Sequence, residues 1–303
     1  MPIQNSPPGI LPSSILHLQS TQQDDSSSLF VFIPGNPGLI EFYEPFLLQV
    51  HLNNPDWEIL GISHAGMNSC DTIQCPVYTL KEQNDHFVAV INRYSKAGRP
   101  LIIMGHSVGA YLTQRVALSN HLVGNVVRIG LITPTLIDIH DSDKGRKLTP
   151  ITAWIPRFHE LVAGLSWVLF EKMLPTSLTS NLLSTLMRVD PQSAMAIATR
   201  TLVTNSRFIK QALGLATEEM RVIRSDWEFQ RTFTEFCQAR NIKIWFLFSN
   251  NDHWVSEQTR KDLIQFFEAN GDPTMLKIDV SPTLEHAFVR RHAEIVVTEY
   301  FGH

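Results

Sequence analysis

The sequence is poor in cysteine: its 303 residues include only Cys70, Cys75 and Cys237, and no C-x-x-C pair. An odd and small number of cysteines in a chain of this length argues against a disulfide framework and indicates a reduced, intracellular protein. A disulfide between Cys70 and Cys75 is the alternative. The first 28 residues lack a basic region followed by an apolar one, so the protein is predicted not to be secreted.

Charge is also scarce, since Asp, Glu, Lys and Arg make up 18% of the residues and the net charge is −4. Runs of Lys and Arg do not exceed two residues, as in the pair Arg290–Arg291. Nucleic-acid binding draws its affinity from basic side chains that neutralise phosphates, so it is excluded as an expectation. No apolar run reaches the roughly 18 residues that a membrane-spanning helix needs.

Several cofactor motifs are missing, namely G-x-G-x-x-G, the Walker loop and H-E-x-x-H. The nearest thing to a metal shell is Asp252 with His253 and His64, which does not form a convincing ligand set. We therefore predict no metal and no cofactor.

Short apolar runs bounded by polar, Gly or Pro residues recur along the chain, and this pattern is typical of buried parallel strands. Segments of helical character separate them, including one with a capping box at Thr79 and Glu82 and one that begins at Ser256 and stops at Gly271. This alternation predicts a mostly parallel sheet with helices on both faces, the α/β class. The expected strands are residues 14–19, 29–33, 58–62, 101–104, 126–132, 242–248 and, more weakly, 277–280.

The alternation stops between about residues 136 and 240, where the sequence is helical in character and has no comparable strand signal. We therefore predict a flexible arm over residues 1–12, a core formed by residues 13–135 and 241–303, and a helical cap inserted at residues 136–240.

The sharpest local signal is Gly105-His106-Ser107-Val108-Gly109, which directly follows an expected strand and precedes a helical stretch. A serine on a tight strand-to-helix turn projects from the sheet, and the turn closes only if the residues two positions away are small. This context favours a catalytic serine over a chance match. It predicts an α/β-hydrolase fold with Ser107 as nucleophile.

A nucleophilic serine needs a base, and the base needs an acid. In α/β-hydrolases the chain order is Ser, then Asp or Glu after a late strand, then His near the C-terminus. Asp252 follows the expected strand 242–248 and His286 follows the last one. We predict that His286 takes the Ser107 proton and that Asp252 orients the imidazole.

Each of these roles has a rival in the sequence. Asp138 follows the expected strand 126–132, where some α/β-hydrolases place the acid. His253 adjoins the predicted acid and should point elsewhere, and His292 lies too far along the following helix.

The oxyanion hole should combine two backbone amides. One is that of Val108, at the start of the helix after the nucleophile. The other is that of Asn36, in the Pro34-Gly35-Asn36-Pro37-Gly38 turn after the expected strand 29–33. The alternative for this segment is a plain tight turn.

Within the predicted cap, residues 161–170 are apolar nearly all the way round the expected helix. Such a helix is either deeply buried or lies against lipid. Trp154, Trp167 and Phe170 are the predicted contacts with a lipid surface, and the alternative is a cap helix that lines an acyl pocket.

The chain resembles a known family, the lipid droplet-associated hydrolases. The similarity rests on Ile33-Pro-Gly-Asn-Pro-Gly38 with Glu41-Phe-Tyr43, Gly105-His-Ser-Val-Gly-Ala-Tyr111, Asn251-Asp-His-Trp-Val255 and Glu285-His-Ala-Phe288. The resemblance implies nucleophile, acid and base at Ser107, Asp252 and His286. It also implies neutral-lipid esters as substrates, cholesteryl esters and triacylglycerol among them, and a place on lipid droplets or the cytosolic side of the endoplasmic reticulum.

The leading hypothesis is a cofactor-free serine esterase or lipase whose partners are a lipidic ester and a droplet or membrane surface. A surface-binding protein with weak catalysis is the second hypothesis. A cytosolic esterase or thioesterase for short acyl chains is the third. The sequence predicts no particular oligomeric state.

Overall fold

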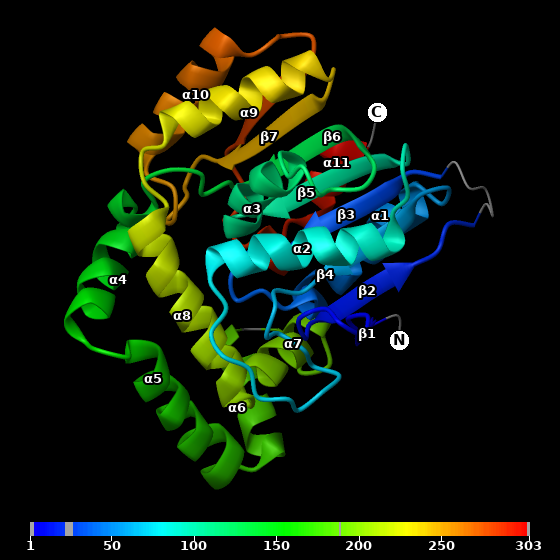
Figure 1. Ribbon diagram of the computed structural model, residues 1–303. Helices are drawn as coiled ribbons and strands as arrows, with labels where there is room; N and C mark the ends of the chain where they lie inside the picture. Colours follow the sequence, from blue (N-terminus) through cyan, green and yellow to red (C-terminus); the bar gives the residue numbers. More distant parts are fainter. Residues whose placement is uncertain (1–2, 22–26, 188, 302–303) are drawn as a thin grey trace.

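The computed structural model describes residues 3–21, 27–187 and 189–301, and within these residues eight strands form one sheet in the order β1-β2-β4-β3-β5-β6-β7-β8 (Figure 1). Strand β2 pairs antiparallel with both β1 and β4, and all the other pairs are parallel. The strands are β1 (Ile3–Asn5), β2 (Ser14–Leu18), β3 (Leu29–Ile33), β4 (Glu58–Ile62), β5 (Pro100–His106), β6 (Asn125–Ile132), β7 (Lys243–Ser249) and β8 (Leu276–Ser281).

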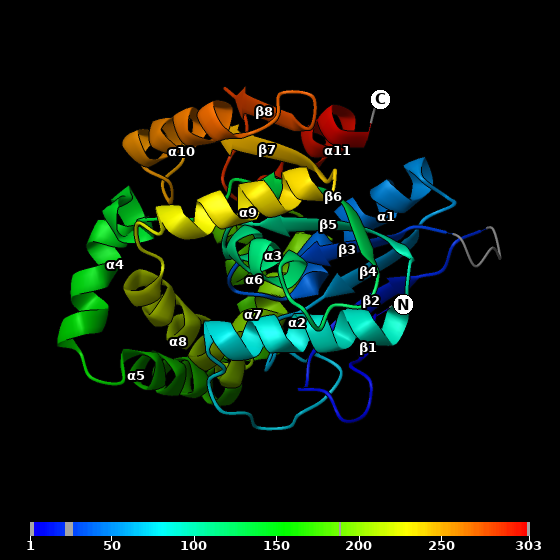
Figure 2. The same ribbon diagram turned by 45° about the horizontal axis from the view of Figure 1, so that its top comes forward.

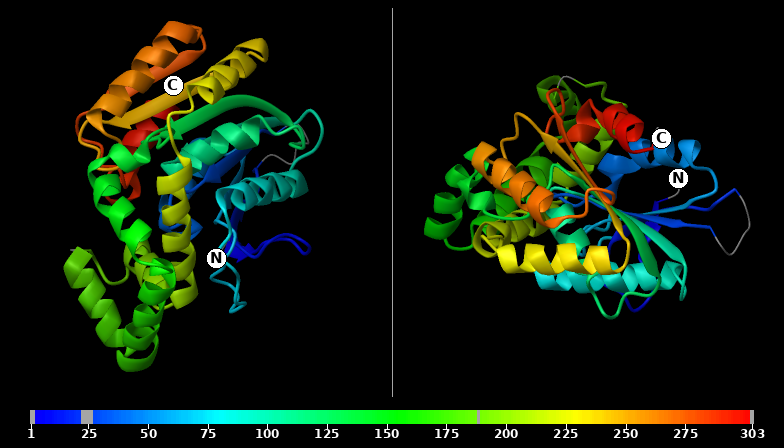
Figure 3. Two further views of the ribbon diagram at one scale, coloured as in Figure 1. Left: turned by 60° about the vertical axis from the view of Figure 1, so that its left-hand side comes forward. Right: turned by 90° about the horizontal axis from the view of Figure 1, so that it is seen from above.

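Helices cover both faces of the sheet, as the view from above in Figure 3 shows. Helices α1 (Glu44–Asn53) and α11 (Ala293–Phe301) pack on one face, against Phe30 and Phe32 of β3. Val31 points to the other face, where the larger core lies. That face carries α2 (Leu80–Tyr94), α3 (Val108–Ala117), α9 (Trp227–Ala239) and α10 (Glu257–Asn270). Strand β3 is buried on both sides along its whole length, and its sequence is accordingly a continuous apolar run.

Between β6 and β7 the chain forms a set of helices that extends beyond the sheet. They are α4 (Asp143–Trp154), α5 (Phe158–Ser166) with a π-helical continuation (Trp167–Met173), α6 (Thr176–Met187), α7 (Ala194–Val203) and α8 (Ser206–Val222). Helices α4 and α5 form the outer edge of the molecule in Figures 1 and 2, and α5 packs along α8. We propose that α4 to α8 form the cap. None of the helices in the described ranges is long and apolar enough to cross a bilayer.

Two segments are placed differently from the division into arm, core and cap that the sequence predicts. Residues 3–5 were expected in a flexible arm, yet they form β1, because the outer edge of β2 offers unpaired backbone groups. Helix α9 was expected in the cap, but its Phe233 and Cys237 belong to the core that includes the sheet. An amphipathic helix packs equally well on a sheet or on other helices, so its pattern alone does not say which.

Candidate active site

Ser107 stands on a sharp turn between β5 and α3, with a backbone φ of 55° that L-residues rarely adopt. The two flanking glycines are needed for this turn. A Cβ on Gly105 would lie 2.3 Å from the Gly109 carbonyl oxygen, and one on Gly109 would lie 2.3 Å from the Ile33 carbonyl oxygen. The G-x-S-x-G spacing therefore has a steric cause here, and the second glycine also lets the chain leaving β3 approach Ser107.

The structure brings together the three side chains that the sequence nominated. His286 Nε2 lies 2.9 Å from Ser107 Oγ, and His286 Nδ1 lies 2.8 Å from Asp252 Oδ2. The Asp252 carboxylate accepts the hydrogen on Nδ1, so Nε2 is left with a lone pair that faces the serine hydroxyl. The Asp252 side chain is 2% exposed, and its other oxygen accepts the backbone amides of Trp254 and Val255 at 2.7 and 3.1 Å.

The rival residues have other partners. Asp138 accepts a hydrogen bond from the Ser225 hydroxyl, and His253 Nδ1 lies 3.5 Å from an Asp143 carboxylate oxygen. His292 Nδ1 accepts the backbone amide of Glu285, 3.3 Å away.

The turn after β3 lies directly against Ser107. A Cβ on Gly35 would come within 2.9 Å of Ser107 Cβ, so this position admits only glycine without a shift of the chain. In the described residues, the backbone amides of Asn36 and Val108 have no hydrogen-bond acceptor. Unpaired amides beside a nucleophile are what an oxyanion hole requires. We therefore propose Asn36 and Val108 as its donors.

A buried hydrogen-bonded chain supports this site from behind. His106 Nε2 lies 2.7 Å from the His286 carbonyl oxygen, which can only accept, so Nε2 carries the ring hydrogen and Nδ1 accepts. Nδ1 lies 2.7 Å from the Tyr43 hydroxyl, which donates to it and itself accepts the Gly35 amide at 3.2 Å. Burial raises the pKa of Tyr43 well above its usual range and lowers the pKa of His106 to about 3, so both groups are neutral. These hydrogen bonds thus join the turn after β3 to the loop that carries His286.

Sequence reasoning missed this supporting role of Tyr43 and His106. Both residues stand in the motifs that carry the family resemblance. The imidazole of His106 inside G-H-S-V-G was the feature of the sequence that could have indicated this role. The direction of each hydrogen bond requires the fold, because the groups come from three separate segments.

A model of the lipid-droplet associated hydrolase family matches residues 26–289. The chain belongs to this family. A lipid droplet-associated hydrolase of Dictyostelium discoideum is 24% identical over 289 residues, covering 92% of this chain and 88% of that protein. The human lipid droplet-associated hydrolase is 26% identical over 297 residues, covering 91% and 84%. The chain is therefore a hydrolase, and the family predicted from the sequence is confirmed.

Solved structures show the same fold at low sequence identity. A haloalkane dehalogenase from Agrobacterium tumefaciens superposes with a TM-score of 0.68 at 13% identity, covering 99% of this chain and 94% of the other. The thioesterase domain of the curacin biosynthetic pathway gives 0.63 at 11% identity, with 98% of both chains covered. With the sheet order described above, these similarities confirm the α/β-hydrolase fold.

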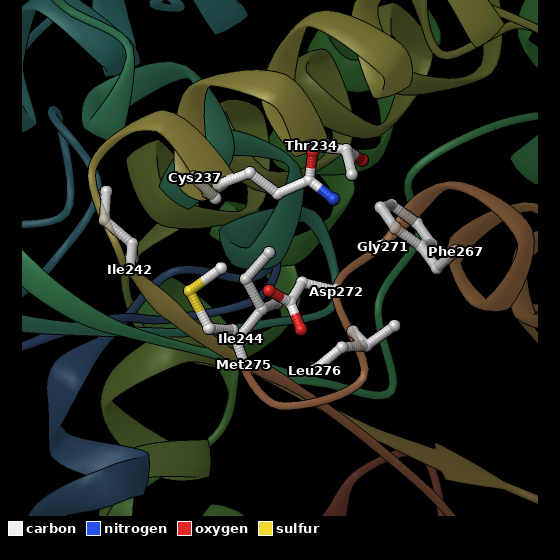
Figure 4. A pocket seen from close by; sticks show the side chains of 10 residues that line it. Thr234, Cys237, Ile242, Ile244, Phe267, Gly271, Asp272, Met275 and Leu276 are labelled. Atoms are coloured by element: carbon white, nitrogen blue, oxygen red, sulfur yellow. The ribbon is translucent and has the colours of Figure 1, made fainter.

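A cavity remote from Ser107, Asp252 and His286 lies between α9, β7 and the loop before β8 (Figure 4). It is lined by Cys237, Ile244, Phe267 and Met275 among others, and its volume is about 10 Å³. That is room for at most one water molecule, so the cavity cannot hold an ester substrate.

The predicted lipid contacts lie on the outer helices. Trp154 at the end of α4 is 85% exposed, Trp167 is also exposed, and Phe170 is half-buried. Sequence reasoning missed a second apolar row on α6, which consists of Leu178, Leu182 and Leu186. Their spacing of four residues places them along one side of the helix, and this period was the signal available in the sequence. Exposed apolar groups of this extent are typical of interaction surfaces.

Three buried histidines predict that the protein is acid-sensitive. Burial lowers the pKa of His64 to about 4 and those of His86 and His106 to about 3. The unfolded chain binds protons below about pH 6.5 that the native state rejects, so stability is complete above that pH and falls as the pH decreases towards 4. Each histidine contributes up to about 1.4 kcal/mol per pH unit.

Urea denaturation between pH 7.5 and 4.5 should therefore show a steep loss of the free energy of unfolding. The variant His86→Gln should have a smaller decrease in the free energy of unfolding per pH unit, by about the contribution of one histidine. An unchanged slope in that variant would contradict the neutral, buried state of the ring.

Proposed function

We propose that the protein is a serine hydrolase that cleaves carboxylic esters of lipids through an acyl-enzyme. The observation that carries this proposal is the continuous hydrogen-bonded row from Ser107 Oγ through His286 to Asp252, with distances of 2.9 and 2.8 Å. A serine hydroxyl aligned with an imidazole, which is in turn oriented by a buried carboxylate, is suited to nucleophilic attack on an acyl carbon.

In the first half-reaction, Ser107 Oγ attacks the ester carbonyl carbon while His286 Nε2 takes the hydroxyl proton. The carbonyl oxygen becomes an oxyanion and receives hydrogen bonds from the amides of Asn36 and Val108. The tetrahedral intermediate then collapses, the bond to the leaving alkoxide breaks, and the imidazolium protonates the departing oxygen. The carboxylate of Asp252 stabilises the imidazolium meanwhile.

In the second half-reaction, water replaces the alcohol as the nucleophile. His286 removes a proton from the water, the hydroxide adds to the acyl carbon, and the ester bond to Ser107 breaks as the proton returns to Oγ. The products are one alcohol and one carboxylic acid. Each step uses groups of this chain and water alone.

The proposed substrate class is neutral-lipid esters, such as cholesteryl esters and acylglycerols, taken from the surface of a droplet or of the endoplasmic reticulum. Two findings support it. The curated relatives are named for lipid droplets, and the outer helices expose large apolar side chains to solvent. A substrate buried in a lipid phase is reached most directly by an enzyme that rests on that phase.

The test is labelling with a fluorophosphonate, together with hydrolysis of esters of increasing acyl length, with and without a lipid emulsion. We expect labelling of the wild type and hydrolysis that increases at the interface with longer acyl chains. High activity on short soluble esters with no interfacial gain would favour the short-chain esterase. Folded protein that neither labels nor hydrolyses any ester would defeat the proposal in favour of a surface-binding role.

If the outer helices dock on a lipid surface, a charged side chain in place of Trp154 should strongly weaken binding to that surface. Replacing this side chain by Asp removes apolar area whose burial in lipid would be worth about 2 kcal/mol, and it adds a group that resists transfer into lipid. We expect Trp154→Asp to lower partitioning onto phospholipid-coated triolein droplets by at least about tenfold, as measured by flotation.

The matched control is Leu52→Asp on α1, on the face of the sheet opposite α2 and α9. Leu52 is 78% exposed, and its variant should bind droplets like the wild type. Equal losses in both variants would contradict docking through the cap.

A further inference from the structure

The cap helix α8 is tied to the core by polar side chains that bond to backbone groups of the core. Gln211 accepts the Tyr78 amide at 2.8 Å and donates to the Tyr78 carbonyl at 3.1 Å. Glu218 accepts the amide of Leu80, the first residue of α2, at 2.8 Å. These hydrogen bonds satisfy backbone groups of the loop before α2 that would otherwise bond to water. They therefore fix α8 against the core.

The same helix also holds the turn that we assign to the oxyanion hole. The side-chain nitrogen of Asn36 has two hydrogens, and both are used. One goes to the Ala212 carbonyl oxygen and the other to Glu219 Oε1, each at 2.8 Å. Glu219 is 4% exposed. A buried carboxyl is costly unless it is hydrogen-bonded, and its recorded partner is this amide.

We propose that Glu219 is a positioning residue for catalysis: through the Asn36 side chain, it fixes the backbone amide of Asn36 where the oxyanion forms. This inference rests on the proposed function. Other atoms of the turn are held separately, since His64 donates to the Pro34 carbonyl at 2.9 Å and Gly35 donates to Tyr43. Asn36 itself is held through its side chain, and both acceptors are on the cap.

The role depends on an acceptor oxygen and not on a charge. Burial raises the pKa of Glu219 to about 7, so the carboxyl is partly protonated near neutrality. Either protonation state leaves an oxygen that accepts from Asn36, and so does the amide of a glutamine. Glu219→Gln should therefore preserve the position of the turn, and Glu219→Ala should not.

The first measurement is steady-state hydrolysis of a soluble ester. Loss of one oxyanion donor costs roughly 100- to 1,000-fold in kcat, and a displaced donor should cost less, so we expect about a 10- to 100-fold lower kcat in Glu219→Ala. KM should change little, because the bond forms in the transition state. The affinity for a trifluoromethyl ketone, whose adduct with Ser107 carries an oxyanion, should fall by the same factor as kcat/KM.

The variants separate positioning from general damage to the fold. Glu219→Gln should retain the wild-type kcat, and Asn36→Ala should reproduce Glu219→Ala with no further loss in the double variant. The matched control is Glu218→Ala, the neighbouring residue on α8, whose carboxylate accepts the amide of Leu80 at the start of α2 and, among the described residues, has no hydrogen bond to the turn. It should lower the melting temperature and leave kcat unchanged.

Amide exchange of peptides covering residues 33–39 gives a second readout that needs no catalysis. We expect faster exchange in Glu219→Ala and wild-type exchange in Glu218→Ala. Wild-type kcat and exchange in Glu219→Ala, or equal losses in both variants, would overturn the inference. If the folded wild type hydrolyses no ester, the proposed function fails, and the exchange rates still decide whether Glu219 positions the turn.

Discussion

Ser107→Ala is expected to lower kcat for ester hydrolysis by about a million-fold and to abolish fluorophosphonate labelling. The variant lacks the atom that forms the bond to the acyl carbon, and loss of the nucleophile from a serine–histidine–aspartate site costs about this factor. The residual rate is that of water attack assisted by the oxyanion hole. The fold should persist, because the hydroxyl's recorded side-chain partner is the imidazole 2.9 Å away.

The measurement compares kcat on a chromogenic ester with the melting temperature of the same preparation. Ser142→Ala is the control, since its hydroxyl accepts the Gly145 amide at the start of α4 and takes no part in the proposed chemistry. Removing that helix cap should cost about 1 kcal/mol of stability and leave kcat unchanged. Hydrolysis by Ser107→Ala at a rate close to that of the wild type would disprove the nucleophile.

Asp252→Asn carries the second largest expected effect, a loss of about 10,000-fold in kcat. The carboxylate accepts the Nδ1 hydrogen of His286 and so leaves Nε2 free to take a proton from Ser107. An amide can turn its NH₂ group towards Nδ1, which then accepts, so the ring hydrogen moves to Nε2 and the base is blocked.

Asp138→Asn provides the comparison, because the sequence offered this residue as the rival acid. Its carboxylate is bonded to Ser225 and lies 4.0 Å from His140 Nδ1. We expect kcat within about threefold of the wild type, since no proton moves through it. A larger loss in Asp138→Asn than in Asp252→Asn would reverse the assignment of the acid.

The parts of the fold that the sequence predicted well are those where one physical requirement dominates. Strands β3 and β4 have the predicted bounds, because residues buried on both faces of a sheet must be apolar, as are all of β3 and the last four residues of β4. The turn at Ser107 was equally predictable, since steric closure demands glycine on both sides. Partners such as Tyr43 and His106 were not predictable, because each requires knowledge of which loops meet.

The same reason explains why Glu219 could not be found from the sequence. A glutamate at the end of an amphipathic helix looks like a solvated charge, and its partner Asn36 lies 183 positions earlier. The two residues meet only because α8 packs over the C-terminal ends of the parallel strands.

This pairing across the chain constrains attempts to exchange caps between relatives in order to change acyl preference. A transplanted α8 without a hydrogen-bond acceptor at the place of Glu219 would leave one N–H of the Asn36 side chain unpaired. The turn after β3 would then lose one of the contacts that hold it. Chimeras designed around the proposed cap should therefore carry positions 36 and 219 as one unit, although one lies in the turn after β3 and the other on α8.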